Sequence, residues 1–464
     1  MDLTEIFSMA GTVGALSQLK FSEVLMDSQN RSAALFERGR KVIPDGVSSP
    51  MRAFAQVGRN PICAVSAKGS RIVDADGRSY VDFLNAFGAL LLGHAPDEIV
   101  SAISEQAARG PVYGLSTEGE YRLAERIVAS TPEIERIRFV CSGTEAVMTA
   151  ARIARSHTGR NLLLKFRGSY HGHSDALLAN PANLLSGAGN AKGVSKGISD
   201  QLNRDVLIVE YNDEQEVAAA FETHGASIAA VLVEPHATNM GFVKSKPQFH
   251  RLLRELCDQH GALLIFDEVV TGFRFRFGAV CTAFGVKPDL VTFGKIIGGG
   301  TPVGAFAGKA EFLDHVALGR NVFQSGTFAA NPLTVAAGNA ALDLLGKPGF
   351  YEALEEKGAF VEGLLRAGFA EHGIPFVVSR HGALLGLAFR DSAEPLLSYR
   401  DVKTQDYKLF EQFHIQMREK GFLLPPSLEE PIFLSAAHTH EDLERFAREA
   451  VQTLHALRSE SVPA

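Results

Sequence analysis

The sequence predicts an α/β fold in which a mostly parallel β-sheet carries helices on both faces. Between about residues 95 and 335, short apolar runs typical of buried strands alternate with amphipathic stretches typical of helices. Two of the runs lead into polar segments, Asp267-Glu268 and Ser142-Gly143-Thr144, at the sheet edge where ligands of such folds gather. With 464 residues, 46% of them hydrophobic, the chain is long enough for one large domain and a smaller one.

Three parts are expected along the chain. Residues 1–90 should form an N-terminal segment with a leading helix and short strands at 62–66, 71–74 and 80–83. Residues 91–340 should form the large domain, with strands at 137–141, 161–166, 229–234, 263–268 and 289–293. Residues 341–464 should form a C-terminal small domain, with strands at 376–379, 384–389 and 432–435 and a closing amphipathic helix near 441–457.

Composition and charge argue against several classes of protein. The net charge is −7 without a long basic run, which argues against nucleic acid as a partner. The four cysteines lie far apart and lack CxxC spacing, which argues against a disulfide framework and a zinc site and suits a reducing cytoplasm. The N-terminus is acidic up to Lys20, unlike a secretory signal, and no apolar run reaches membrane-spanning length.

Lys295 and Asp267 are the most informative pair in the sequence. Asp267 ends one apolar strand-like run, and Lys295 follows another and precedes a glycine-rich stretch. Pyridoxal 5'-phosphate (PLP) requires a lysine for its Schiff base and a carboxylate that keeps its pyridine nitrogen protonated. Taken alone, the pair fits an ordinary strand-end acid and a surface lysine equally well.

A phosphate site is predicted at Ser142-Gly143-Thr144, where a strand runs into a helix. Free N–H groups and the positive end of the helix dipole favour an anion there, although a plain N-cap is the alternative reading. Tyr170, after the strand at 161–166, could stack on a flat cofactor ring or simply pack in the core. The adjacent His171-Gly172-His173 lacks a third ligand at a familiar spacing, which argues against a metal site. Residues 324–327 form a second candidate loop for phosphate binding or a turn.

These motifs together resemble the class III (omega) aminotransferase family of fold type I PLP enzymes. The resemblance runs from about Arg38 to about Arg458 and rests on five motifs: Ser142-Gly143-Thr144, Tyr170-His171-Gly172-His173, Phe266-Asp267-Glu268-Val269 with Thr271-Gly272-Phe273-Arg274, the run from Gly294 to Gly300, and Ser325-Gly326-Thr327. It implies a large domain with a mostly parallel seven-stranded sheet, and a smaller α+β domain built from both termini. It also implies a homodimer with shared active sites.

The resemblance assigns roles to individual residues. Lys295 and Asp267 would be the catalytic residues, with Lys295 carrying the cofactor and Asp267 facing its pyridine nitrogen. Thr327 would reach the phosphate of the neighbouring subunit's cofactor. The other residues expected to bind the cofactor are Ser142, Gly143 and Thr144 at the phosphate, Tyr170 on the ring, and Glu234 and Asn239 beside the phenolic oxygen.

A smaller set resembles the aminomutase branch of the family, which shifts an amino group within one small substrate of the glutamate-semialdehyde type. Arg52 matches the residue that binds the substrate carboxylate, and Glu430 matches an active-site acid that favours an amine or aldehyde at the other end. The sequence departs from this branch at Phe87, at Pro431-Ile432, in the gating region 178–202 and in an extra segment of roughly thirty N-terminal residues.

The expected function is therefore PLP-dependent amino-group transfer on a small carboxylate-bearing amino or aldehyde substrate. An intermolecular transaminase, acting on a β- or ω-amino acid with a keto-acid acceptor, is the main alternative, and Phe87 and the altered gating region favour it. A racemase, a decarboxylase or a non-catalytic binding protein of the same fold stays open, because a Schiff base alone does not choose the reaction.

Overall fold

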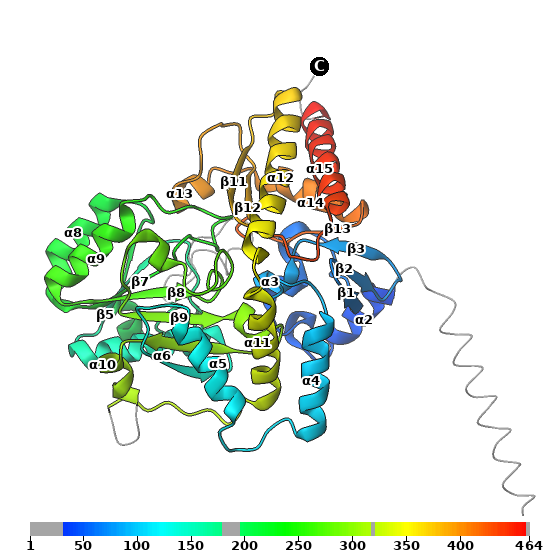
Figure 1. The fold of residues 1–464 in the computed structure, drawn as a ribbon. Helices are drawn as coiled ribbons and strands as arrows, with labels where there is room; N and C mark the ends of the chain where they lie inside the picture. Colours follow the sequence, from blue (N-terminus) through cyan, green and yellow to red (C-terminus); the bar gives the residue numbers. More distant parts are fainter. Residues whose placement is uncertain (1–30, 179–194, 317–320, 461–464) are drawn as a thin grey trace, which may run out of the picture.

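The computed structural model describes residues 31–178, 195–316 and 321–460 and confirms the predicted α/β fold (Figure 1). The N-terminal extension, residues 1–30, and most of the predicted gating region, residues 179–194, lie outside the described residues. Among the residues that are described, none of the helices combines the length and apolar character needed to cross a bilayer.

A seven-stranded sheet forms the centre of the large part of the molecule. Its strands are β4 (Arg136–Val140), β5 (Leu162–Phe166), β6 (Val206–Val209), β7 (Ile228–Val233), β8 (Leu263–Glu268), β9 (Leu290–Gly294) and β10 (Gly304–Gly308). Their order is β4-β10-β9-β8-β7-β5-β6. Only β10 is antiparallel to its neighbours, and the pairs from β6 to β9 are parallel.

Helices cover both faces of this sheet, as the strand composition requires. Along β8, Leu263 and Ile265 pack into a cluster with α6 (Gly143–Thr158), while Leu264 and Phe266 pack into the main core with α9 (Phe249–His260). Successive strand residues point to opposite faces, so a strand that is apolar throughout must be covered twice. In Figure 1, α8 (Glu214–His224) and α9 lie on one side of the sheet and α6 on the other.

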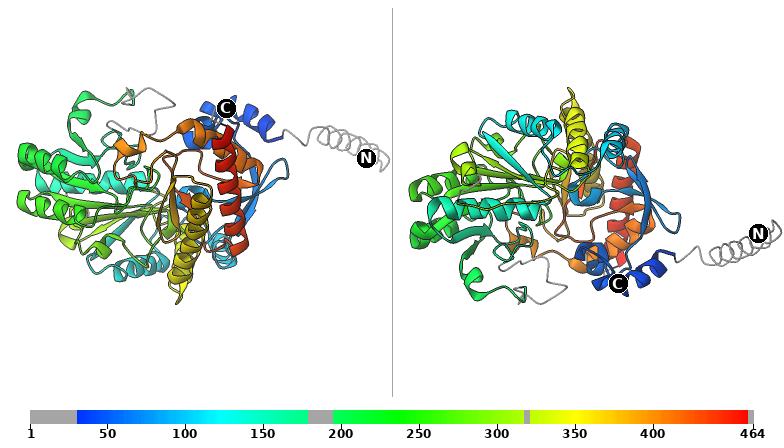
Figure 2. Two further views of the ribbon diagram at one scale, coloured as in Figure 1. Left: turned by 90° about the horizontal axis from the view of Figure 1, so that it is seen from above. Right: turned by 90° about the horizontal axis from the view of Figure 1, so that it is seen from below.

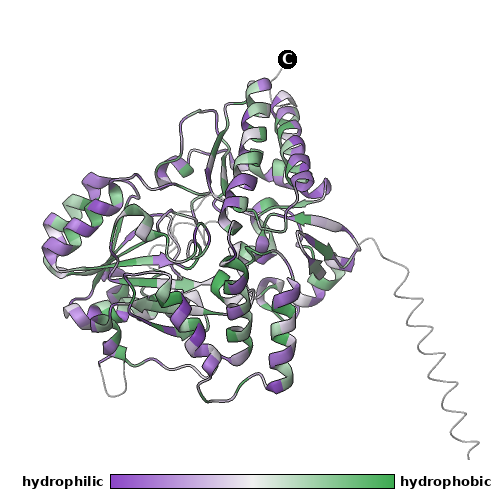
Figure 3. Cartoon of the chain, in the orientation of Figure 1, coloured by the Kyte–Doolittle hydropathy of each residue, from purple (hydrophilic) through white to green (hydrophobic). Residues whose placement is uncertain are grey.

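The remaining elements of the large part surround the sheet. The helices are α4 (Asp97–Arg109), α5 (Glu118–Ala129), α7 (Asp200–Arg204), α10 (Ala310–Leu313) and α11 (Pro332–Leu345). The long α12 (Phe350–Glu371) follows and packs against the smaller part. Short 3-10 helices are η4 (Gly225–Ser227), η5 (Cys281–Phe284), η6 (Lys295–Gly298) and η7 (Asp314–Val316). The central strands are mostly hydrophobic, whereas outer helices such as α4 and α15 carry many hydrophilic residues (Figure 3).

The smaller part joins both ends of the chain. A four-stranded sheet contains β1 (Ala64–Lys68), β2 (Arg71–Asp74), β3 (Ser79–Asp82) and the late strand β13 (Phe422–Leu423), which runs parallel to β3. A second sheet contains β11 (Val377–His381), β12 (Leu384–Ala388) and β14 (Ile432–Phe433). This arrangement agrees with the expected fold class, whereas the domain boundaries at residues 90 and 340 stay predictions.

Helices complete the smaller part. They are α2 (Arg31–Arg40), α3 (Asn85–Gly88), α13 (Tyr399–Val402), α14 (Tyr407–Glu419) and α15 (His440–Glu460), with 3-10 turns η1 (Pro44–Gly46), η2 (Pro50–Ala53) and η3 (Ala55–Val57). Figure 2 shows α12 and α15 running side by side next to the central sheet.

Two strands of the central sheet were not predicted from the sequence. β6 has four residues, and β10 reads Gly304-Ala305-Phe306-Ala307-Gly308, which carries little strand signal. The glycines of β10 are explained by close backbone approach. A Cβ at Gly304 would lie 2.1 Å from the Ser142 carbonyl oxygen, and one at Gly308 would lie 2.4 Å from that of Asp289.

Candidate active site

Adjacent parallel strands bring Asp267 and Lys295 to one edge of the sheet. Asp267 on β8 is paired in register with Thr292 on β9, and Lys295 follows the end of β9 as the first residue of η6. Lys295 has a left-handed φ of 47°, which turns the chain sharply after the strand. Strained backbone of this kind is tolerated where the surrounding structure holds it, often at functional sites.

Asp267 is held by a set of hydrogen bonds and is only 6% exposed. Its Oδ1 accepts from the Val269 N–H at 3.0 Å and from the Thr292 hydroxyl at 3.2 Å, while its Oδ2 lies 2.7 Å from Nδ1 of His171. Burial lowers the pKa of His171 despite this carboxylate, so the ring is neutral and donates its Nδ1–H. The other ring nitrogen, Nε2, is buried without a partner among the described residues.

Lys295 lies among several charged groups. Burial lowers its pKa, and the positive charge of Arg274 acts in the same direction. The charges of Glu430, Asp267 and Glu234 oppose this effect. Residues from three segments of the sequence are therefore gathered around one amine, and the lowered pKa favours its free-base form.

Two acids near Lys295 have pKa values raised into the neutral range. Burial raises the pKa of Glu234 to about 7, and the charge of Asp267 acts in the same direction. Thr238 donates its N–H to Oε2 of Glu234 at 3.0 Å and its hydroxyl to the same oxygen at 2.5 Å. Burial also raises the pKa of Glu430 to about 7, although Lys295 lowers it and Glu429 raises it further.

The predicted phosphate segment begins α6. Ser142 is the N-cap, and its hydroxyl accepts the Glu145 N–H at 3.2 Å. Gly143 and Thr144 occupy the first helical positions, where N–H groups have no intrahelical acceptor. A Cβ at Gly143 would lie 2.8 Å from a Val269 methyl group, so glycine lets the helix start lie against the segment after Asp267.

The Tyr170 loop lies across this helix start. Gly172 has φ 90°, and a Cβ there would meet the Thr144 hydroxyl at 2.6 Å. Thr144 Oγ1 also lies 3.2 Å from Nδ1 of His173. The phenol of Tyr170 interacts with Thr144, and the charges of Asp267 and Glu430 raise its pKa, after burial as the largest cause. Tyr170 therefore lies between the phosphate candidates and the carboxylates.

Three predicted site residues are less closely joined to this centre. Arg52 is exposed in η2, and Thr327 is exposed in the segment before α11. No hydrogen bond or ion pair joins either side chain to another described residue. Asn239 is partly buried beside Thr238, with Nδ2 3.5 Å from its hydroxyl.

Phe87 lies in a left-handed turn that the sequence did not predict. Asn85, Ala86 and Phe87 have φ values of 44°, 50° and 56°, although α3 is counted as a helix. Such residues cost roughly 1–2 kcal/mol each in this conformation. The turn is held because Asn85 donates its side-chain N–H to the Phe433 carbonyl at 2.6 Å and to that of Asp82 at 3.0 Å.

Arg274 is a buried cation whose role the sequence did not reveal. It is 1% exposed, and burial lowers its pKa to about 9. It donates to the Val270 carbonyl at 2.8 Å and to the Gly88 carbonyl, and it lies 5.2 Å from the centre of the Phe433 ring. No described carboxylate forms an ion pair with it. In the sequence, Arg274 was marked only by its place in the motif Thr271-Gly272-Phe273-Arg274. Its burial and its hydrogen-bond partners depend on tertiary contacts.

The residues fit a flat cofactor that carries a phosphate and a ring nitrogen. Free N–H groups at the start of α6 suit the phosphate, and the glycines at 143 and 172 let the segment after Asp267 and the Tyr170 loop pack closely against this helix start. Asp267 retains acceptor capacity beyond its three partners, which suits a protonated ring nitrogen. Lys295 supplies the amine for covalent attachment.

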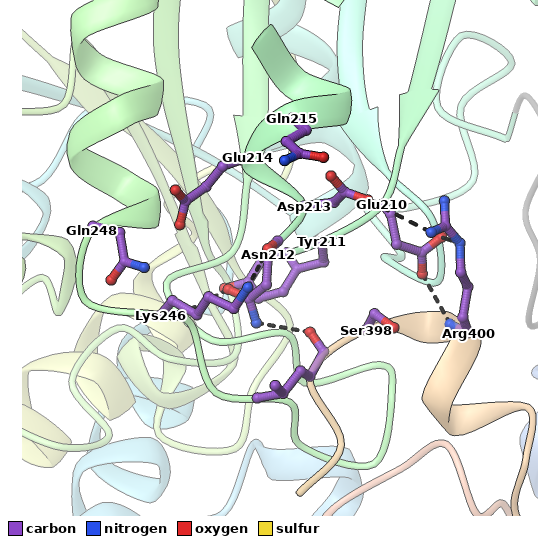
Figure 4. A pocket seen from close by; sticks show the side chains of 11 residues that line it. Glu210, Tyr211, Asn212, Asp213, Glu214, Gln215, Lys246, Gln248, Ser398 and Arg400 are labelled. Atoms are coloured by element: carbon purple, nitrogen blue, oxygen red, sulfur yellow. Dashed lines mark hydrogen bonds and ion pairs between the residues drawn. The ribbon is translucent and has the colours of Figure 1, made fainter. Parts of the chain in front are cut away.

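A cavity of about 450 Å³ lies elsewhere, between the start of α8 and α13 (Figure 4). It is lined by Glu210, Asn212, Lys246, Arg400 and their neighbours, and none of the predicted site residues lines it. Its main charges are paired with one another, as Arg400 is with Glu210. The chemistry therefore points to Lys295 and not to this cavity.

Comparisons with known proteins agree on one family. The family model described as aminotransferase class III matches residues 54–454. The chain is 46% identical over 425 residues to a glutamate-1-semialdehyde 2,1-aminomutase of Thermomicrobium roseum, covering 91% of this chain and 97% of that protein. It is 44% identical over 422 residues to glutamate-1-semialdehyde 2,1-aminomutase 2 of Exiguobacterium sibiricum, covering 91% and 95%.

Solved structures lead to the same fold. An omega-transaminase from Sphaerobacter thermophilus has a TM-score of 0.85 and 32% identity, covering 94% of this chain and 99% of that one. A transaminase with PLP bound has a TM-score of 0.82 and 28% identity, covering 93% and 98%. A glutamate-1-semialdehyde aminomutase from Pseudomonas aeruginosa has a TM-score of 0.79 and 27% identity, covering 91% and 94%.

Proposed function

The chain belongs to the class III aminotransferase family, and from this premise we propose that it is a PLP-dependent glutamate-1-semialdehyde 2,1-aminomutase. The expected PLP-dependent amino-transfer chemistry is confirmed at the level of the family. The observation that carries the narrower proposal is the acid Glu430 near Lys295, with its pKa raised to about 7, together with the relatives of 42–46% identity that bear this name.

The proposed roles follow from the charges around Lys295. Bound PLP supplies an electron sink for the negative charge that develops on a substrate carbon. Lys295 holds the cofactor and, as a free base, moves the proton between substrate and cofactor carbons, because its pKa is lowered. Asp267 accepts a hydrogen bond from the ring nitrogen, and its own position is fixed by His171.

The substrate ends are assigned by charge. Glu430, with its pKa raised to about 7, would face the amine or aldehyde end and disfavour a second carboxylate. Arg52 would bind the substrate carboxylate, since a guanidinium grips a carboxylate with two parallel hydrogen bonds. Truncation of Arg52 should raise the KM for carboxylate substrates and leave the reaction of simple amines unchanged.

The deciding experiment supplies glutamate-1-semialdehyde to the purified enzyme without any second substrate. An internal shift of the amino group gives 5-aminolevulinate, and its steady formation is the expected result. The Lys295→Ala variant serves as the blank for uncatalysed isomerisation. Absence of product above this blank, from protein with full cofactor content, would refute the aminomutase proposal.

An intermolecular transaminase is the second candidate. It is favoured by the left-handed turn that carries Phe87 beside Gly88 and Arg274, because this wall departs from the aminomutase pattern. The structural similarity to an omega-transaminase also supports it. Steady turnover of a β- or ω-amino acid with a keto acid, together with failure of the single-substrate assay, would establish this function instead.

The proposal includes a homodimer in which Thr327 reaches the cofactor of the partner subunit. Large apolar side chains next to Thr327 support it, since Phe323 is 81% and Phe328 59% exposed in the single chain. Leu115, at 79% exposed, is another candidate for an interface. A fully active monomer in light scattering at assay concentration would refute this part.

A cytoplasmic location completes the proposal, and no membrane or nucleic-acid partner is proposed. The four free cysteines support a reducing compartment. Fractionation of the native host would test it, and recovery of the enzyme outside the cytoplasm would contradict it.

A further inference from the structure

Glu429, the residue before Glu430, lies at the centre of a polar cluster that no sequence motif predicted. It is 7% exposed. One oxygen, Oε1, accepts from Nζ of Lys403 at 2.7 Å, from the Tyr407 hydroxyl at 3.0 Å and from the Tyr399 hydroxyl at 3.2 Å. Three donors from α13, its C-cap and α14 therefore fix the position of this carboxylate oxygen.

The donors of this cluster form one unit. Nζ of Lys403 lies 4.8 Å from the ring centre of Tyr399 and 5.4 Å from that of Tyr407. Burial raises the pKa of both phenols, and the charge of Glu429 acts in the same direction, so both stay protonated donors.

The backbone on both sides of Glu429 is fixed as well. The Gly241 N–H donates to the Glu429 carbonyl at 2.7 Å, and the Glu430 N–H donates to the Ser427 carbonyl at 3.2 Å. Gly241 has φ 70°, and a Cβ there would lie 2.8 Å from the Leu428 carbonyl oxygen. This close approach fixes the direction in which the chain presents Glu430.

The short helix α13 that supplies Tyr399 is tied to the large part of the molecule. Arg400 donates its backbone N–H to Glu210 at 3.0 Å (Figure 4). Its guanidinium lies 3.1 Å from Glu216. Tyr399 also packs on Gly168, where a Cβ would lie 2.5 Å from the Tyr399 ring. The Tyr399 side chain is therefore held from both directions.

We propose that Glu429, bound by Lys403, Tyr399 and Tyr407, is a positioning residue that orients Glu430 and tunes it as the acid of the substrate pocket. This inference rests on the proposed function, because it explains how the pocket favours an amine or aldehyde end. Glu429 acts through two routes. Its pinned backbone directs Glu430 towards Lys295, and its fixed charge disfavours ionisation of its neighbour.

The charged and titratable groups that face Glu430 come from three segments. Lys295 at the start of η6 favours its ionised form, whereas Glu429 on the same segment opposes ionisation, and burial opposes it most. Tyr170, in the loop after β5, is near enough for the Glu430 charge to raise its pKa. Among the charged neighbours, Glu429 is therefore the one whose removal should most directly lower the pKa of Glu430.

The test measures the protonation of Glu430 directly in the purified holoenzyme. The carboxylic acid band in the infrared spectrum is followed against pH and assigned by its loss in Glu430→Gln. Glu429→Gln keeps the shape of the side chain and removes the charge, so the midpoint should fall by about one pH unit. Lys403→Met leaves the Glu429 charge uncompensated and should shift the midpoint upward.

Two controls separate the charge effect from loss of structure. Tyr407→Phe disturbs the same cluster without changing its charge and should leave the midpoint in place. Lys408→Met removes an exposed lysine from the same helix, α14, and should also leave it in place. An unchanged midpoint in Glu429→Gln, or an equal shift in Tyr407→Phe, would overturn the proposal. The readout needs no substrate, so it can fail or succeed independently of the aminomutase assay.

Discussion

Replacing Asp267 by asparagine should remove most of the activity while keeping the fold and the cofactor. The geometry tolerates this change. The asparagine carbonyl can accept from Val269 and Thr292, as Oδ1 does now at 3.0 and 3.2 Å. Its NH₂ group would then face Nδ1 of His171, and the proton of His171 can move to Nε2, which has no described partner. A cost in stability of about 1–2 kcal/mol follows from the weakened hydrogen bonds.

The loss of rate should be much larger than the loss of stability. The carboxylate is 6% exposed, so its charge is little screened by water. Removal of one preorganised electrostatic group from a buried site costs about 2.7–4 kcal/mol, which corresponds to roughly a 100- to 1000-fold lower kcat. The same change should lower the pKa of Glu234, because the charge of Asp267 now raises it.

A matched control is available in the same sheet. Asp289 is also buried next to a strand, where it pairs with Arg254 at 2.8 Å and accepts from the Leu264 N–H at 2.7 Å, but at the opposite edge. Asp289→Asn should lower stability and leave the kcat of the folded enzyme unchanged. The assay compares kcat, cofactor content and urea unfolding for both variants. An Asp267→Asn enzyme with full cofactor and near-parental kcat would refute the role of the carboxylate.

Three further predictions follow from the structure. Lys295→Ala should abolish covalent cofactor attachment, and mass spectrometry after borohydride reduction of the parent should find the label on Lys295; a label on another lysine would contradict this. Gly172→Ala should weaken cofactor binding about tenfold or more, because the new Cβ would meet the Thr144 hydroxyl at 2.6 Å in a backbone conformation of φ 90°. Titration of cofactor-free protein with PLP measures the Kd, and an unchanged Kd would refute the phosphate assignment. Burial lowers the pKa of His414 to about 4. Between pH 6.5 and pH 4 the unfolded chain therefore binds a proton that the folded chain does not, and the free energy of unfolding decreases as the pH decreases. Relative to His414→Phe, the parent should lose about 2–3 kcal/mol of unfolding free energy between pH 7 and pH 4.5, and parallel profiles would contradict this.

Local sequence patterns were sufficient to predict the strand and the helix start on which the site is built. The run at 263–268 was predicted as a buried strand and is β8, with the same bounds. Ser142 was placed at the start of a helix, and it is the N-cap of α6. These features depend on residues that are neighbours along the chain. Hydrophobic periodicity and helix capping are therefore enough to predict them.

Features set by contacts between distant residues were not predicted. β10 has a weak strand pattern, and its glycines make sense only beside the backbones of Ser142 and Asp289. The pairing of His171 with Asp267 joins residues 96 positions apart. In the sequence, His171 was considered only as a possible metal ligand. The left-handed turn at 85–87 is stabilised by Phe433, far along the chain.

The sequence by itself determined the class of fold, the family, and the pair of residues expected to carry the cofactor. The fold class and the residue pair follow from strand periodicity and from reactive side chains at strand ends, which are local properties, and the family follows from the resemblance of the sequence motifs. Only the tertiary structure decided the electrostatic state of the site. The pKa of Glu430 depends on burial, on Lys295 and on Glu429, and the Glu429 side chain is held in turn by Lys403 and by two tyrosines from α13 and α14. Burial and charge proximity are properties of the folded chain, so no local pattern could have predicted them.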